Sequence, residues 1–227
     1  MIAVVDYDTG NLRSVAEALR RAGAEFTLTS DAALLRRAER VILPGVGEAS
    51  SAMAKLRQRG LDEVLPTLTC PVLGICIGMQ LLCLSSEEGD ARCLGIFPTR
   101  VRRLSTVSET PQGPSGPANG PALAGDTPRS GSSAAATAPH ARLKIPHVGW
   151  DTIQGVRSPL FEGIPEESYV YYVHSFAADP CPATIATTDY GRCFSAALNR
   201  DNFYGTQFHP EKSGATGARL LRNFLSL

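Results

Sequence analysis

The stretch that decides the fold is Val72-Leu73-Gly74-Ile75-Cys76-Ile77-Gly78-Met79, in which an apolar run passes through two glycines into a predicted helix. The continuous apolar run Val72–Ile75 is typical of a strand that is buried on both faces of a sheet. A helix is predicted over Met79–Leu84. The small residues on either side of Cys76 permit a sharp strand-to-helix turn, which would lift the cysteine above the edge of the sheet.

The same alternation of strand and helix runs through the first hundred residues. The predicted strands are Ile2–Asp6, Glu25–Thr29 and Val41–Leu43, and the predicted helices are Leu12–Leu19, Asp31–Ala38 and Ala49–Leu56. Further strands are predicted at Tyr169–His174, Thr184–Thr188, Phe194–Asn199 and Phe203–Phe208, followed by an amphipathic helix at the C-terminal end. This rhythm predicts an α/β fold with a mostly parallel central sheet and helices on both faces.

One segment breaks this pattern. Of the 34 residues in Thr106–Pro139, 27 are Pro, Gly, Ser, Thr or Ala. Such a composition cannot bury enough apolar surface to offset the entropy lost on ordering. We predict a disordered insertion here, within a single domain that spans residues 1–227; a functional lid is the alternative.

Composition limits the possible functions. Of the 227 residues, 43% are hydrophobic, and 22 Lys and Arg balance 22 Asp and Glu. This balance gives no reason to expect binding to nucleic acid or to an anionic membrane. No apolar run is long enough for a transmembrane helix, and Met1–Asp6 lacks the basic residues that open a signal peptide. We therefore expect a cytoplasmic protein.

The cysteines and histidines do not have the spacing of a zinc site. The six cysteines include no C-x-x-C pair, and the four histidines are far apart in the sequence. We therefore predict no metal, and we expect most of the thiols to be buried, inert and reduced.

Cys76 is the candidate nucleophile. The amides and the positive end of the helix that follows it favour the thiolate form of the side chain. Alone, the motif fits a small buried core residue equally well. A base and a carboxylate, His209 and Glu211, follow the predicted strand Phe203–Phe208, at the edge where such sheets place their sites. A cysteine, a histidine and a glutamate in this joint arrangement arise by chance much less often than the cysteine motif alone.

A second glycine-rich turn, Pro44-Gly45-Val46-Gly47, follows another predicted strand. Its peptides can approach a substrate closely and could donate amides to an oxyanion hole. By itself this pattern is also that of an ordinary tight turn.

Gly74–Gln80 together with Phe208–Glu211 resembles the class I, triad-type glutamine amidotransferases. Within them, the sequence is similar to the glutaminase subunits of imidazole glycerol phosphate synthase. The stretches that carry this closer resemblance are Ile2–Ser14, Pro44–Gly47, Ser86–Gly89, Lys144–Trp150, Tyr171–Ser175 and His209–Ser213. The resemblance covers nearly the whole chain outside the predicted insertion.

The resemblance implies hydrolysis of glutamine to glutamate and ammonia through a γ-glutamyl thioester, without a cofactor. Cys76 would attack the carboxamide, His209 would move protons, and Glu211 would orient the imidazole. Main-chain amides at Val46, Gly47 and Ile77 would form the oxyanion hole. The implied glutamine-binding residues are Gln80, Glu88, His174 and Ser175.

The resemblance also implies a heterodimer. In the family, the ammonia passes to a (βα)8-barrel synthase subunit that makes imidazole glycerol phosphate and an aminoimidazole-carboxamide ribonucleotide in histidine biosynthesis. The positions that match the subunit interface are Asn11, Trp150, Tyr171 and Lys212. Asp8 and Asp151 depart from the family pattern, which has Gly and Asn there, and they add negative charge near the expected interface.

Two alternatives remain open at this point. The chain could be the glutaminase component of another complex, such as anthranilate synthase, although its Asp-Tyr-x-x-Gly-Asn opening and Lys212 argue against this. It could instead be a redox-sensing flavodoxin-like domain whose thiol is oxidised. Such a sensor would need no base held by a carboxylate.

Overall fold

A computed structural model describes residues 1–8, 10–105 and 143–227. The insertion predicted at 106–139 lies outside the described residues, and its interruption of a single domain stays a prediction. The centre of the described part is a seven-stranded sheet in the order β11-β12-β13-β4-β3-β1-β2. Its strands are β1 (Ile2–Val5), β2 (Phe26–Thr29), β3 (Arg40–Leu43), β4 (Val72–Ile75), β11 (Thr184–Asp189), β12 (Cys193–Arg200) and β13 (Phe203–Thr206).

The sheet is mostly parallel, as the sequence predicts. β2, β1, β3, β4 and β13 all pair in parallel, whereas β11 and β12 add an antiparallel edge. β4 lies in the middle, and every residue of it is buried. This explains why its sequence is apolar without alternation. The parallel pairing of β13 with β4 brings the chain after residue 206 next to the turn at Cys76.

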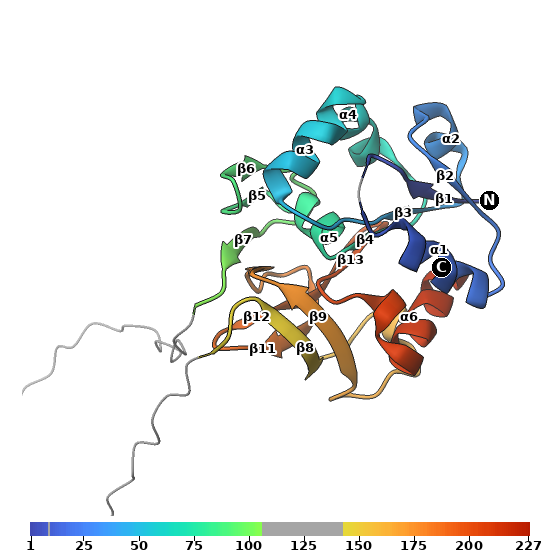
Figure 1. Cartoon of the computed structure of the whole chain (residues 1–227). Helices are drawn as coiled ribbons and strands as arrows, with labels where there is room; N and C mark the ends of the chain where they lie inside the picture. The colour runs from blue at the N-terminus through green and yellow to red at the C-terminus, as the bar shows by residue number, and fades with distance from the viewer. Residues whose placement is uncertain (9, 106–142) are drawn as a thin grey trace, which may run out of the picture.

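Helices cover both faces of the sheet. In Figure 1, α2, α3 and α4 lie on one side, and α1 and α6 lie on the other. α1 is amphipathic: its apolar residues Val15, Ala16, Ala18 and Leu19 are buried, whereas its last turn carries the basic residues Arg20 and Arg21. The bounds are α1 (Leu12–Arg21), α2 (Ala32–Arg37), α3 (Ala49–Gln58), α4 (Leu61–Val64), α5 (Ile77–Leu81) and α6 (Gly214–Ser226), with single 3-10 turns at η1 (Leu65–Thr67), η2 (Pro159–Phe161) and η3 (Pro210–Lys212).

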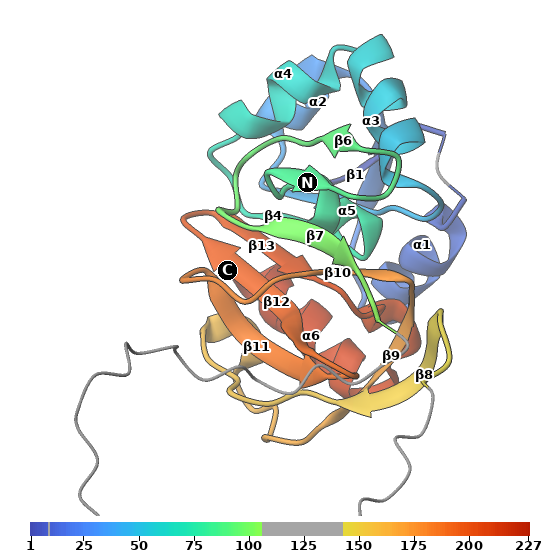
Figure 2. The same cartoon turned by 90° about the vertical axis from the view of Figure 1, so that its left-hand side faces the viewer.

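Two small sheets that the sequence analysis did not predict accompany the central one. The first has the order β10-β7-β5-β6, and the second is the antiparallel pair β8-β9. Figure 2 shows β7 and β10 side by side in front of the central sheet. Their strands are β5 (Ser85–Ser86), β6 (Ala91–Arg92), β7 (Arg100–Arg103), β8 (His147–Thr152), β9 (Tyr169–His174) and β10 (Phe176–Ala178). β9 coincides with the predicted strand Tyr169–His174, whereas β5 and β6 have two residues each and carry too little periodicity to be predicted.

The helix predicted at Met79–Leu84 is wrong at both ends, because α5 spans Ile77–Leu81. It begins directly after Cys76, and Ser85 already pairs in β5. Gly78 explains the early start. A Cβ at this position would collide with the carbonyl oxygen of Leu43, so only glycine lets α5 lie this close to β3. No helix in the ranges described is both long and apolar enough to cross a membrane.

Candidate active site

Cys76 occupies the sharp turn between β4 and α5. Its backbone has φ 54° and ψ −111°, a left-handed conformation that is uncommon for a residue with a side chain. Such strain costs about 1–3 kcal/mol and persists only where the surroundings enforce it. Cys76 immediately precedes the first residue of α5, and it is 3% exposed. The turn therefore holds the thiol at the positive end of a helix, as the sequence predicts.

His209 and Glu211 follow β13, which is the parallel neighbour of β4. The Nδ1 atom of His209 lies 2.7 Å from the Oε1 atom of Glu211, and both side chains are buried. The amide of Asn11 donates a second hydrogen bond of 2.6 Å to the same oxygen. Because Nδ1 faces the carboxylate, Nε2 of His209 is the nitrogen available to the thiol.

The charges of the three groups are coupled. Burial alone would lower the pKa of His209, but the charge of Cys76 and hydrogen bonds with Cys76 and Glu211 raise it to about 10. Burial alone would raise the pKa of Glu211, but its hydrogen bonds with His209 and Asn11 hold that pKa below its usual value. The site thus favours a protonated imidazole between a thiol group and a carboxylate.

The segment Pro44–Gly47 runs beside this turn. Gly45 packs so closely on the start of α5 that a Cβ would come within 2.7 Å of the Gly78 nitrogen. This approach brings Val46 and Gly47 next to Cys76, and Gly47 has a positive φ of 98°. Ile77 is the first residue of α5, so its amide has no acceptor within the helix. Val46, Gly47 and Ile77 therefore line the same cavity as Cys76.

A cavity of about 290 Å³ opens above the thiol. It is lined by the predicted nucleophile and base, by the three predicted oxyanion residues, by the four predicted substrate residues and by Lys212. The other lining residues are Pro146, Val173 and Phe176. Residues from both ends of the sequence therefore meet around one cavity. Glu211, Asn11, Trp150 and Tyr171 do not line it.

Two of the lining residues are polar groups suited to an amino acid. Glu88 accepts a hydrogen bond of 3.1 Å from the amide of Ala49, and burial raises its pKa. The amide nitrogen of Gln80 donates to the carbonyl of Phe176, and no partner of the buried Gln80 Oε1 is found among the described residues. Gln80 and Glu88 both line the cavity, and amide and carboxylate oxygens are acceptors that suit the hydrogen-bond donors of an ammonium group.

Comparison with known proteins agrees with this geometry. Residues 3–227 match the glutamine amidotransferase class-I family. The protein named imidazole glycerol phosphate synthase subunit HisH of Bacteroides thetaiotaomicron is 48% identical over 226 residues, covering 100% of this chain and 99% of that protein. The protein of the same name from Yersinia pseudotuberculosis is 40% identical, with the same coverage.

The chain belongs to the HisH family of class-I glutamine amidotransferases. Among solved structures, a glutamine amidotransferase of Thermotoga maritima aligns over 99% of this chain and 82% of its own, with a TM-score of 0.55 and 16% identity. That likeness concerns the fold. Neither open alternative is favoured for this HisH-family chain: the relatives carry the synthase name, and the cavity with the thiol also holds a histidine that is hydrogen-bonded to a carboxylate.

The HisH-family chain also contains polar residues that the sequence analysis missed. Gln207 is fully buried, and its Nε2 atom lies 3.7 Å from the sulfur of Cys76. Its place directly before Phe208-His209 was the available signal, since a polar residue at the end of a buried strand needs a partner. Asn11, predicted at the interface, is buried and supports Glu211 directly.

His174, which lines the cavity, contacts a second buried histidine, His147. Nδ1 of His147 lies 3.2 Å from Nε2 of His174, and Nδ1 of His174 lies 2.8 Å from the carbonyl of Phe176. Burial lowers the pKa of His174 to about 3, so its ring is neutral near pH 7. With its Nδ1–H donated to Phe176, the ring anchors the end of β9 at the cavity.

Both acidic departures from the family pattern have basic partners within this chain. Asp8 forms an ion pair with Arg59 that follows α3, and its carbonyl accepts a hydrogen bond of 2.7 Å from Lys55. Asp151 lies 3.4 Å from Nε2 of His147. The two carboxylates therefore interact with their own chain.

Proposed function

We propose that the chain hydrolyses L-glutamine to glutamate and ammonia with Cys76, His209 and Glu211 as its catalytic residues. The observation that carries the proposal is the alignment of a strained cysteine, a histidine and a carboxylate beside one cavity. The membership of the class-I glutamine amidotransferases supports it over the full length of the chain.

In the first half of the reaction, the sulfur of Cys76 attacks the carboxamide carbon of glutamine. The oxygen becomes an oxyanion, which the amides at Val46, Gly47 and Ile77 would stabilise. His209 gives its Nε2 proton to the nitrogen, which leaves as ammonia, and a γ-glutamyl thioester remains on Cys76.

In the second half, His209 is neutral and accepts a proton from water as the water attacks the thioester carbon. Collapse of the intermediate releases glutamate and restores the sulfur of Cys76. Glu211 keeps Nδ1 protonated throughout and so leaves Nε2 for each transfer. In this proposal, Gln80, Glu88, His174 and Ser175 hold the α-amino and α-carboxylate groups of glutamine in the cavity.

We further propose that the ammonia passes to a barrel synthase subunit bound over the outer face of β8 and β9. Trp150 and Tyr171 pair across these strands, with ring centres 5.8 Å apart. Trp150 is 54% exposed and Val148 is 56% exposed, which is a large apolar surface for a free protein. Val173 belongs to the same face and also lines the cavity, so the surface borders the site of ammonia release.

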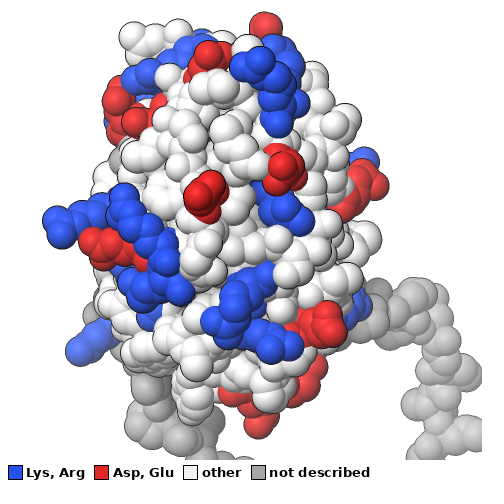
Figure 3. Space-filling view, turned by 90° about the vertical axis from the view of Figure 1, so that its right-hand side faces the viewer, with Lys and Arg blue, Asp and Glu red and all other residues white. Residues whose placement is uncertain are grey.

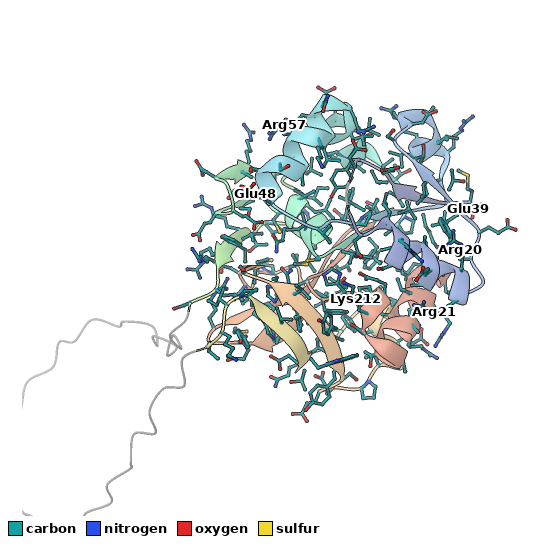
Figure 4. All side chains as sticks on the ribbon, in the orientation of Figure 1. Arg20, Arg21, Glu39, Glu48, Arg57 and Lys212 are labelled. Atoms are coloured by element: carbon teal, nitrogen blue, oxygen red, sulfur yellow. The ribbon has the colours of Figure 1, made fainter. Side chains whose placement is uncertain are left out.

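Basic side chains beside this face suggest the chemistry of the partner surface. Arg21, Arg222 and Lys212 line a second cavity, between α1 and α6. Figure 3 shows the side of the molecule with α1 and α6, where blue side chains gather in clusters, and Figure 4 labels Arg21 and Lys212. A partner rim with carboxylates would complement them, and the association would then weaken as salt increases.

The proposed product of the assembly is imidazole glycerol phosphate, formed by the barrel subunit during histidine biosynthesis. The names of the relatives support this assignment. We place the heterodimer in the cytoplasm, because all six cysteines are free, as expected in a reducing compartment.

The test is glutamate release from glutamine by the wild-type chain and by Cys76→Ala, each with and without a barrel synthase subunit from a HisH-containing relative. We expect the partner to stimulate the wild type and Cys76→Ala to be inactive, while both bind the partner equally. Release by Cys76→Ala at the wild-type rate would exclude the mechanism. Stimulation by a chorismate-using partner instead would move the chain to another complex.

A further inference from the structure

The fully buried side chain of Gln207 contacts the thiol of Cys76 without lining the cavity above it. We propose that Gln207 is a catalytic residue: its amide N–H donates a hydrogen bond to the sulfur of Cys76 and stabilises the thiolate that attacks glutamine. The Nε2–Sγ distance of 3.7 Å is within the range for a hydrogen bond to sulfur. The inference rests on the proposed glutaminase function, because it assigns a role only in forming that nucleophile.

A chain of hydrogen bonds determines which end of the Gln207 amide faces the sulfur. The carbonyl oxygen of Phe176 can only accept, so the Gln80 side chain turns its NH₂ group toward it, at 3.0 Å. The second hydrogen of that NH₂ group is donated to Oε1 of Gln207, also at 3.0 Å. The NH₂ group of Gln207 is thereby left on the side of Cys76.

The opposite orientation of Gln207 would be unfavourable at both ends. Its Oε1 would face the sulfur, and its NH₂ group would meet the NH₂ group of Gln80. Both contacts are repulsive, and the side chain has no exposed surface on which water could compensate them. The direction of this amide is therefore set by the main chain of β10, and the same carbonyl of Phe176 also accepts from His174.

The other neighbours of the sulfur show why a donor is needed. The carbonyl oxygen of Val173 lies 4.0 Å from Sγ. That oxygen can accept from a thiol but repels a thiolate. Within the described ranges, His209 and Gln207 are the side chains that offer the sulfur a proton donor, and Gln207, unlike His209, cannot lose its proton. It therefore remains a donor to the sulfur in every protonation state of His209.

The experiment replaces Gln207 by Met, which has similar length and no donor, and by Glu, which keeps an oxygen for Gln80 but offers the sulfur an acceptor. Alkylation of Cys76 by iodoacetamide is followed against pH, with mass spectrometry to separate it from the other cysteines. We expect the midpoint of the alkylation profile to rise by about one pH unit or more in both variants. The kcat for glutamine should fall by about 10- to 100-fold, while KM changes little.

Thr206→Val is the matched control. Thr206 is the neighbouring residue, it is equally buried, and its hydroxyl finds no hydrogen-bond partner in the part of the chain that is described. This variant should keep the wild-type alkylation profile and kcat. If Gln207→Met does not fold, Gln207→Glu still tests the proposal, because it preserves the contact with Gln80.

A wild-type alkylation profile and kcat in either folded Gln207 variant would overturn the inference. With Cys76→Ala inactive, that result would leave the proposed function intact. If Cys76→Ala retained activity, the proposed function itself would fail. The two failures are therefore distinguishable.

Discussion

At the scale of single residues, the site depends on how burial and charge compete at His209. A buried imidazole favours the neutral form, yet the facing thiol group and Glu211 reverse this and raise the pKa to about 10. Asn11 contributes indirectly to the pKa of His209, because its hydrogen bond to Glu211 helps to keep that carboxylate ionised. The protonation of His209 thus depends on Cys76, Glu211 and Asn11 together, which lie far apart in the sequence.

The charge of Cys76 is the largest cause that raises this pKa, so its removal should lower it. We expect the ring of His209 to titrate near pH 10 in the wild type and at lower pH in Cys76→Ala, as measured by NMR of the imidazole nitrogens. The folded chain holds this proton more tightly than the unfolded chain. The pairing therefore contributes stability that is fully present below about pH 6.5 and is lost as pH rises through about 10. An unchanged titration in Cys76→Ala would show that burial and Glu211 alone set the pKa.

At the scale of elements, the close contact of α5 with β3 and β4 holds the thiol in place. The contact exists because glycines lie where the backbones meet. The glycines on either side of Cys76 correctly predict the turn there, but the predicted helix begins two residues too late. Sequence spacing shows that a helix follows a strand, whereas the exact start depends on the space left by β3.

Gly78→Ala should destabilise the fold by about 3 kcal/mol, because its methyl group would overlap the carbonyl oxygen of Leu43. Gly95→Ala is the control: Gly95 has a positive φ of 74°, but no atom lies near its Cβ position. It should cost only about 1 kcal/mol. Urea unfolding measures both. If Gly78→Ala cost no more than Gly95→Ala, the contact with Leu43 would have yielded, and close packing would not explain the glycine at 78.

At the scale of the whole molecule, the last described residue before 106–142 and the first described residue after it lie near each other. A Cβ at Gly191 would meet both the side chain of Leu143 and the carbonyl oxygen of Ser105. Ser105 and Leu143, the described residues on either side of 106–142, are therefore close together. The proposed catalytic residues come from the described parts on either side of it.

Replacing residues 106–142 by a short Gly-Ser linker should change the free energy of unfolding by less than about 1 kcal/mol, because a short loop can join ends that are already close. Glutaminase activity without the partner should also be unchanged. Urea unfolding and glutamate release test this. Loss of the partner-stimulated activity alone would favour the alternative that the segment is a functional lid.

The sequence by itself determined the α/β class, the parallel strands, the turn at Cys76 and the pairing of His209 with Glu211, because each depends on patterns within a few residues. Only the tertiary structure decided that Gln207 faces the sulfur, that Asn11 supports Glu211 and that β8 and β9 present an apolar face. The physical reason is distance along the chain. Asn11 and Glu211 are 200 positions apart, and local periodicity contains no information about a hydrogen bond that forms only when the sheet assembles.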